Sequence, residues 1–215
     1  MSARDEIRDA IRTTGVIGVV RAPVAERAAE LAETLLRAGL AAVEISLITP
    51  DALNVIAHCR SLGIGHVGAG TVIDDASAEV ALRAGAQFIA SYTFDADMVQ
   101  AADEADVLVI PGAGTVTEAA HAFDLGADFL RLFPARVFGP DGVRDLLEGI
   151  PNMPLMASGG ITLDNAADYI TAGCSALSLG RVLTDGGPEE TASRVAAVLA
   201  SVAEARDRMR GAPRA

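Results

Sequence analysis

The chain has 215 residues, 51% of them hydrophobic, and a formal net charge of −12. A chain of this length fits one compact domain with a sizeable core, so we expect residues 1–215 to form a single domain. The acidic balance argues against nucleic acid and anionic membrane surfaces as partners, because both are bound through basic patches.

In chain order, short apolar segments alternate with amphipathic ones. We expect strands at residues 15–21, 41–46, 65–70, 87–91, 106–110, 128–134, 155–158 and 176–180. We expect helices at residues 4–13, 24–37, 50–61, 76–83, 115–124, 142–148, 163–171 and 188–210, with one more between the fourth and fifth strands. Glycine follows many of the helices, as a C-cap with positive φ favours.

Eight strands alternating with helices predict a closed parallel (β/α)8 barrel, or TIM barrel, with an N-terminal lead-in helix at 4–13. A doubly wound open sheet is the alternative. We favour the barrel because no G-x-G-x-x-G turn follows the first strand. Residues 211–215 should form a frayed tail.

Three observations bear on location. The sequence has no charge-free apolar window of about 18 residues, so we expect no membrane span. The charged residues 1–6 lack the apolar core of a signal peptide. The two cysteines, Cys59 and Cys174, do not make a disulfide framework, which indicates a cytoplasmic protein.

The sixth predicted strand carries a charge in its middle, at Arg131. Burying an unpaired guanidinium costs several kcal/mol or more, so Arg131 needs a carboxylate or an anionic ligand inside the fold. Side chains alternate along a strand, and this alternation places Phe129, Arg131 and Phe133 inside the barrel. In the second strand it places Glu44 and Ser46 inside. We therefore expect Glu44 and Arg131 to interact, either as part of an active site or as a structural ion pair.

The active site of such a barrel lies at the carboxyl ends of its strands. This rule selects Arg21, Gly70, Thr71, Ser158, Gly159, Gly160, Gly180 and Arg181. The loops after the seventh and eighth strands are the usual phosphate site, where glycine lets backbone N–H groups approach an anion. Tyr92 follows the fourth strand, where its hydroxyl can donate to an oxyanion.

No His, Asp and Glu cluster has the spacing of a zinc or iron site, and we expect no metal or other cofactor. A divalent cation held by Glu44 with Asp74, Asp75 and Asp95 is the alternative, although acidic residues at these places are more often helix N-caps.

The basic residues carry a further restriction, because all 17 are arginine and the chain contains no lysine. Compositional drift explains the loss of lysine at most surface positions. The absence of lysine also means that the chain lacks the side-chain amine that a Schiff base with a carbonyl substrate requires.

The chain resembles the KDPG/KHG aldolase family, whose names stand for 2-keto-3-deoxy-6-phosphogluconate and 4-hydroxy-2-oxoglutarate. The segments that carry this resemblance are Val43-Glu44-Ile45, Val67-Gly68-Ala69-Gly70-Thr71-Val72, Ile110-Pro111-Gly112, Leu132-Phe133-Pro134-Ala135 and Ser158-Gly159-Gly160-Ile161. Members are class I, lysine-dependent lyases on a trimeric barrel, so the resemblance implies a homotrimer that binds a small anionic substrate.

The resemblance also implies roles for single residues. It makes Glu44 the general acid/base, has Arg21 and Thr71 hold the carboxylate of a keto acid, and has Gly159 and Gly160 hold a phosphate.

The departures from the family pattern fall on the chemistry. The family's Schiff-base lysine falls at Arg131, and its Ser-Pro turn after the fourth strand is Ser91-Tyr92-Thr93. Arg136 stands where an acidic residue often follows the Phe-Pro-Ala turn, and Ile48 stands where some members have arginine. Arg181 takes a position that is usually small. The anion-binding frame is thus kept and the covalent catalyst is missing.

Three functions fit this pattern. The first is a lyase for a small 2-keto acid, with or without a phosphate, that uses Glu44, Arg131 and Tyr92 rather than a Schiff base. The second is an isomerase, epimerase or decarboxylase of a small anionic metabolite on the same barrel. The third is a non-catalytic binder of keto acids or phosphates.

Overall fold

The structure is a computed structural model that describes residues 1–211. Residues 212–215 of the predicted domain, and with them most of the predicted frayed tail, lie outside the described residues. Residue 211 closes the last helix.

The described residues form nine parallel strands in one sheet, in the order β5-β4-β3-β2-β1-β9-β8-β7-β6. The strands are β1 (Val16–Val20), β2 (Ala42–Ser46), β3 (His66–Gly70), β4 (Phe88–Ala90), β5 (Leu108–Ile110), β6 (Gly112–Ala113), β7 (Leu130–Leu132), β8 (Leu155–Ser158) and β9 (Ala176–Leu179).

The predicted (β/α)8 barrel is confirmed, with one difference at the fifth strand. Pro111 divides that strand into β5 and β6, because proline has no N–H to give to the sheet. β5 pairs with β4, and β6 pairs with β7. Backbone hydrogen bonds from Asp128 N to Val109 O (3.2 Å) and from Arg131 N to Pro111 O (2.8 Å) join the two edges of the sheet.

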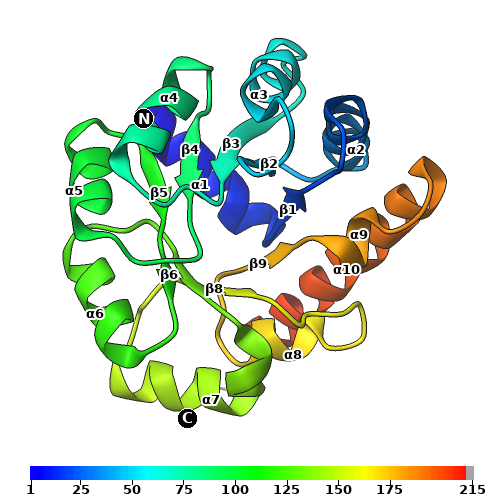
Figure 1. The fold of residues 1–215 in the computed structure, drawn as a ribbon. Coiled ribbons are helices and arrows are strands. Elements are labelled where there is room, and N and C mark those ends of the chain that lie inside the picture. The colour runs from blue at the N-terminus through cyan, green and yellow to red at the C-terminus, as the bar shows by residue number, and fades with distance from the viewer. Residues whose placement is uncertain (212–215) are drawn as a thin grey trace.

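Ten helices lie in residues 1–211, and most of them surround the strands (Figure 1). They are α1 (Ala3–Thr14), α2 (Ala25–Arg37), α3 (Ala52–Ser61), α4 (Asp75–Arg83), α5 (Ala96–Glu104), α6 (Val116–Asp124), α7 (Ala135–Gly149), α8 (Ala166–Thr171), α9 (Arg181–Thr184) and α10 (Pro188–Gly211). No helix in the described part of the chain combines the length and the apolar character that crossing a membrane requires.

Two helical segments were not predicted from the sequence. α7 begins directly after the β7 strand and is kinked at Gly139, which has φ 64° and is followed by Pro140. The predicted helix at 142–148 is the part beyond this kink. The short helix α9 follows β9, where only a loop was expected.

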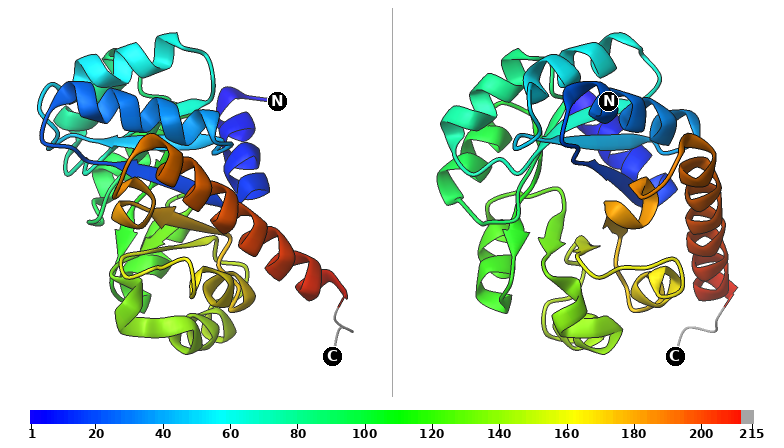
Figure 2. Two further views of the ribbon diagram at one scale, coloured as in Figure 1. Left: turned by 90° about the vertical axis from the view of Figure 1, so that its right-hand side faces the viewer. Right: turned by 45° about the vertical axis from the view of Figure 1, so that its right-hand side comes forward.

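α1 closes the amino-terminal end of the barrel and occupies the place of the predicted lead-in helix. Its buried residues, Ile7 and Ile11, belong to one apolar cluster with interior side chains of the strands, among them Phe88, Leu108 and Phe129. Figure 2 shows α1 at one end of the strands and α10 along the outside, where it packs against α8 and α2. The candidate site therefore lies at the other end.

The alternation predicted for the strands is confirmed. Val43 and Ile45 of β2 and Leu130 and Leu132 of β7 belong to the outer apolar layer between strands and helices. Phe129, just before β7, belongs to the inner cluster.

Candidate active site

A buried ion pair crosses the interior of the barrel. Arg131 Nη1 donates to Glu44 Oε1 at 2.9 Å, Arg131 Nη2 donates to Glu44 Oε2, and both side chains are completely buried. The pair joins β7 to β2, which are separated in the sheet by β1, β9 and β8. Gly70 makes room for it, because a Cβ at that position would lie 2.8 Å from Glu44 Oε1. The predicted interaction between Glu44 and Arg131 is confirmed.

The pair is charged and incompletely satisfied. Burial alone would lower the pKa of Arg131, but the charge of Glu44 and its hydrogen bonds leave that pKa raised, so the guanidinium is a permanent cation. In the described structure Arg131 Nε is buried without a hydrogen-bond partner. Buried donors normally have a partner, so this N–H is available to an acceptor that enters the barrel.

Tyr92 covers the pair from above. The guanidinium carbon of Arg131 lies 4.9 Å from the centre of the Tyr92 ring, a cation–π contact. The ring of Tyr92 lies 4.5 Å from that of Phe133 at an interplanar angle of 49°. Gly112 is needed here, because a Cβ would overlap the backbone of Tyr92. Burial, then Glu44, raises the pKa of Tyr92, so its hydroxyl remains protonated and can donate at neutral pH.

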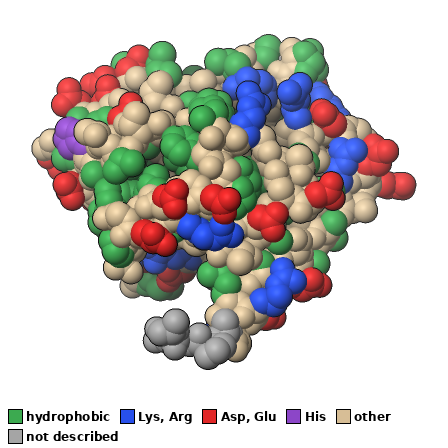
Figure 3. Space-filling model, turned by 90° about the horizontal axis from the view of Figure 1, so that it is seen from below, with side chains coloured by type: hydrophobic (Ala, Val, Ile, Leu, Met, Phe, Trp, Pro, Cys, Tyr) green, Lys and Arg blue, Asp and Glu red, His purple; other side chains and the backbone are tan. Residues whose placement is uncertain are grey.

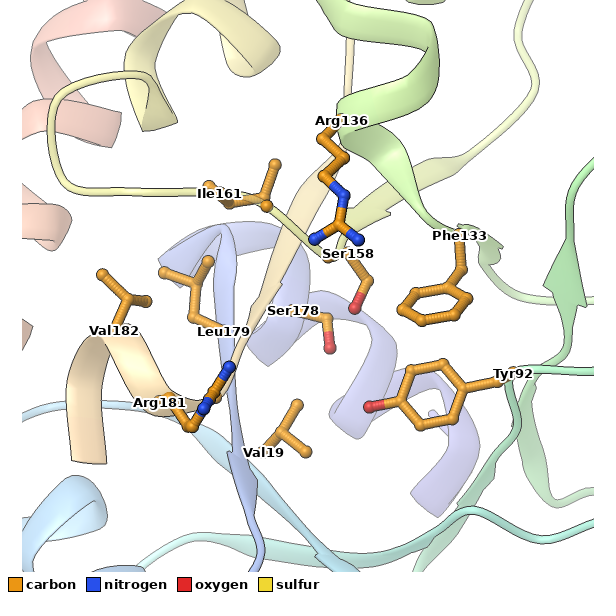
Figure 4. A pocket seen from close by; sticks show the side chains of 13 residues that line it. Val19, Tyr92, Phe133, Arg136, Ser158, Ile161, Ser178, Leu179, Arg181 and Val182 are labelled. Carbon is orange, nitrogen blue, oxygen red and sulfur yellow. The ribbon is translucent and has the colours of Figure 1, made fainter. Parts of the chain in front are cut away.

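A cavity of about 350 Å³ opens at the carboxyl ends of the strands, and Tyr92 forms part of its wall, with its hydroxyl pointing toward the other lining residues (Figure 4). An adjoining cavity of about 360 Å³ shares Val19, Tyr92, Phe133, Gly180 and Arg181 with it and adds Arg21 and Thr184. Glu44 and Arg131 line neither cavity. Tyr92 and Phe133 therefore separate the cavities from the ion pair. The first cavity is lined by Val19, Tyr92, Phe133, Arg136, Ser158, Gly159, Gly160, Ile161, Ser178, Leu179, Gly180, Arg181 and Val182.

Three arginines stand at the mouth of these cavities. Arg21, Arg136 and Arg181 are exposed, and none of them forms an ion pair with an acidic side chain of residues 1–211. In Figure 4 the guanidinium groups of Arg136 and Arg181 point into the cavity from different sides. The mouth is therefore a positively charged region in a protein with a net charge of −12.

The turn after β8 shapes the same cavity. Gly159 and Gly160 both have positive φ, 85° and 87°, a conformation that residues with a Cβ rarely adopt. A Cβ on Gly160 would also overlap the side chain of Arg136, and one on Gly159 would lie 2.9 Å from the Phe133 ring.

Two polar residues of the first cavity were not among the predicted site residues, Arg136 and Ser178. Arg136 lies in the first turn of α7, beyond the strand end that the barrel rule examines, and the sequence showed it only as a departure from a family pattern. Ser178 is an interior residue of β9, and its buried hydroxyl has no partner in the described structure. The same alternation that selected Glu44 selects Ser178 if it is applied to the eighth predicted strand.

The two residues predicted to bind a carboxylate, Arg21 and Thr71, differ in whether they line a cavity. Arg21 lines the adjoining cavity of about 360 Å³, whereas Thr71 lines neither cavity. The Thr71 hydroxyl lies 2.7 Å from that of Ser46, the last residue of the strand that carries Glu44, and Thr71 has φ 61°.

The acidic residues considered as cation ligands have other contacts. Asp74 accepts from Ser77 N at 2.7 Å and Asp95 accepts from Met98 N at 2.7 Å, so both cap helices. Asp75 accepts from Ala76 N. Within residues 1–211 no three His, Cys, Asp or Glu side chains gather in a way that could hold a metal ion.

The fold and the cavity define an α/β barrel with a positively charged mouth at the carboxyl ends of its strands. The family model "KDPG and KHG aldolase" matches residues 7–198, and the chain belongs to this family.

Relatives with known names and structures agree with this placement. The chain is 32% identical over 195 residues to 2-dehydro-3-deoxy-6-phosphogalactonate aldolase of Escherichia coli K12, an alignment that covers 88% of this chain and 95% of the relative. The 2-keto-3-deoxy-6-phosphogluconate aldolase of Zymomonas mobilis, solved with 3-phosphoglycerate, superposes with a TM-score of 0.79 at 28% identity and covers 95% of this chain and 96% of its own. A component of a cube-shaped cage designed by fusing symmetric oligomeric domains superposes with a TM-score of 0.85 at 30% identity, over 91% of this chain and 74% of that one.

Proposed function

We propose that the protein is a carbon–carbon lyase for a small phosphorylated 2-keto acid and that it works without a Schiff base. The observation that carries this proposal is the arrangement of the site. A cavity with arginines at its mouth is lined by a tyrosine, and the tyrosine packs against a buried Glu–Arg pair. The family and the phosphorylated sugar acid in the name of the E. coli relative support the same substrate class.

The mouth supplies the phosphate site of this proposal. Ser158, Gly159, Gly160, Gly180 and Arg181 line the cavity, as the position after the seventh and eighth predicted strands requires. Arg21, close by, would take the carboxylate of the keto acid. The Zymomonas relative was solved with a phosphorylated acid, which is consistent with a phosphate site in this fold.

The chemistry follows from the groups that the chain has. In a 4-hydroxy-2-keto acid, a base removes the proton of the C4 hydroxyl, the C3–C4 bond breaks, and an aldehyde leaves. The bonding electrons pass to the C2 carbonyl as an enolate, which then takes a proton at C3 to give the shorter keto acid. Glu44 would move the protons. The Arg131 cation and the Tyr92 hydroxyl would stabilise the enolate oxygen, a preorganised electrostatic role.

This proposal requires the Tyr92 ring to move. The ion pair is closed off from the cavity, and both carboxylate oxygens of Glu44 accept hydrogen bonds from Arg131. A substrate that displaces the ring would reach the unpartnered Arg131 Nε and would free Glu44 to act as a base.

The first test combines turnover with trapping. Release of pyruvate from phosphorylated 4-hydroxy-2-keto acids would be followed in the wild type, in Glu44→Gln and in Arg131→Lys. We expect turnover in the wild type and its loss in Glu44→Gln. Borohydride with pyruvate should leave the wild-type mass unchanged, because the chain has no lysine and α1 holds the N-terminal amine at the opposite end of the barrel.

Arg131→Lys is the matched control, since a lysine there supplies the amine and should give a trapped adduct. An adduct on the wild type would overturn the proposed mechanism.

One observation favours a second function, a non-catalytic binder of keto acids or phosphates. The Glu44–Arg131 pair is satisfied on both carboxylate oxygens and closed by Tyr92, as a structural ion pair would be. Binding of phosphorylated keto acids without turnover in any wild-type assay would select this function.

We also propose that the protein is a homotrimer. Ile48 and Ile73 follow the neighbouring strands β2 and β3 and are 60% and 61% exposed, and Val80 of α4 lines one hollow with Leu47 and Thr49, the neighbours of Ile48. A relative that serves as a symmetric oligomeric domain in a designed cage supports assembly of this kind. Light scattering should give three times the 22.0 kDa chain mass, and Ile73→Glu should reduce it to the mass of one chain.

A further inference from the structure

A second cavity lies at the amino-terminal end of the barrel, opposite the candidate active site. We call it the basal cavity. Its volume is about 700 Å³, and its wall is formed by the end of α1, the loop before β9 and one face of α10. The lining residues are Arg12, Thr13, Thr14, Ser175, Leu199, Val202, Ala203, Arg206 and Arg210.

The charge of this cavity is one-sided. Three of its lining residues are arginines, and none of the described lining residues is acidic. The whole chain has 29 acidic and 17 basic residues, so a cavity whose charged lining residues are all basic runs against the composition. On the face of the molecule drawn in Figure 3, by contrast, acidic and basic side chains are interspersed.

Arg206 is held in place by the backbone. Its Nη1 donates to Thr13 O and its Nη2 donates to Ser175 O, each at 2.8 Å, so it ties α10 to the segments before β1 and β9. Gly15 makes room for it, because a Cβ there would lie 2.6 Å from Arg206 Nη2. Burial and the neighbouring Arg210 lower the pKa of Arg206, the direction expected where a cation lacks an opposite charge.

The other two arginines retain free donors. Arg12 lies with its guanidinium carbon 5.8 Å from the centre of the Phe129 ring and forms no ion pair with the described residues. Arg210 donates one hydrogen bond, to Asp207 at 2.7 Å, on the exposed side of α10. Like charges that face one hollow repel one another, and a multiply charged anion removes that repulsion while filling several guanidinium donors at once.

We propose that the basal cavity binds a small polyanion, a phosphate ester or a polycarboxylate, independently of the candidate active site. A volume of this size accommodates a small metabolite. The anion lies between Arg12 and Arg210, with Arg206 fixed behind them.

The test uses two probes, pyrophosphate and citrate, measured by titration calorimetry at constant ionic strength. The variant Arg12→Gln with Arg210→Gln removes two charges and keeps Arg206, which supports the backbone. Arg208→Gln is the matched control, since Arg208 is exposed on the same helix and does not line the cavity. Arg181→Ala is included because it should weaken the anion site proposed at the other end of the barrel.

We expect at least one probe to bind at the basal cavity of the wild type. The affinity of this binding should be the same in Arg181→Ala and in Arg208→Gln. In the double variant the affinity for this probe should fall by about tenfold or more. Its unfolding temperature without probe should stay near that of Arg208→Gln. Stronger binding of pyrophosphate indicates a phosphate ligand and stronger binding of citrate a polycarboxylate. Unchanged binding in the double variant, binding that depends only on Arg181, or no binding of either probe would overturn the proposal.

Discussion

The candidate site has two regions that both depend on arginine, in opposite ways. We call the buried Glu44–Arg131 pair the floor and the region around Arg21, Arg136 and Arg181 the mouth. At the floor, Arg131 is completely buried and held by both oxygens of Glu44. At the mouth, Arg21, Arg136 and Arg181 are exposed and have no acidic partner among the described residues. The same residue type, arginine, is therefore a fixed and neutralised group at the floor and a cation without an acidic partner at the mouth.

This difference separates two tasks. The charges at the floor cancel, so they attract no anion until a ligand rearranges them. The cations at the mouth attract anions but are too exposed to stabilise charge as strongly as a buried group does. We infer that ligand affinity depends mainly on the mouth and that any chemistry depends on the floor.

The strongest test of this comparison removes one charge from the floor. Glu44→Leu leaves the Arg131 cation buried and unpaired, and the loss of a partner from a buried pair costs about 3–5 kcal/mol. We expect the free energy of unfolding to fall by that amount in urea titrations.

The matched variant is Glu44→Leu with Arg131→Met, which removes both charges and should recover most of the lost stability. Arg181→Ala, at the exposed mouth, should change the stability by less than about 0.5 kcal/mol. A single Glu44 variant as stable as the wild type would show that the floor is not the rigid pair described here.

A second test concerns selective binding at the mouth. Arg181→Ala should weaken phosphate-bearing ligands by about 10- to 100-fold, because a hydrogen bond to a charged group contributes about 1.5–3 kcal/mol. Pyruvate should bind nearly as before, since it carries no phosphate. Calorimetric titrations measure both affinities, with Arg144→Ala as control, because Arg144 is exposed and pairs with Asp141 on α7. Equal losses for both ligands would place the phosphate elsewhere.

The smallest expected signal concerns Tyr92, which lies between the two regions. The chain has no tryptophan and two tyrosines, and the second, Tyr169, donates to Ala135 O inside the helical layer. In Tyr169→Phe, tyrosine fluorescence therefore comes from Tyr92 alone. A phosphorylated keto acid should change its intensity, and inorganic phosphate, which at the candidate site reaches only the mouth, should not. If calorimetry detects the keto acid and fluorescence does not change, the ring does not move on binding.

Much of the floor could be predicted from the sequence. A charged residue in the middle of an apolar strand demands a partner, and the alternation of β2 and β7 pointed Glu44 toward it. The positions after the seventh and eighth predicted strands led to the double glycine and to Arg181, because the carboxyl ends of parallel strands share one edge.

The missing parts depend on distances that no local pattern encodes. The cover formed by Tyr92 depends on how closely the β4 loop passes Gly112. Arg136 reaches the cavity from a helix whose first turn the sequence did not reveal, since Gly139 and Pro140 interrupt its pattern. The hydroxyl contact of Thr71 with Ser46 and the positive φ of Thr71 are likewise not predictable from its residue type.

The ion pair also affects how the barrel assembles. Glu44 and Arg131 are 87 positions apart in the chain, on strands that share no backbone hydrogen bond. A slip of either strand by one residue would turn its charge into the apolar helical layer and leave the other buried alone. The pair therefore discriminates against misregistered barrels: apolar side chains would tolerate many alignments of these two strands, and a bidentate contact across the centre tolerates one.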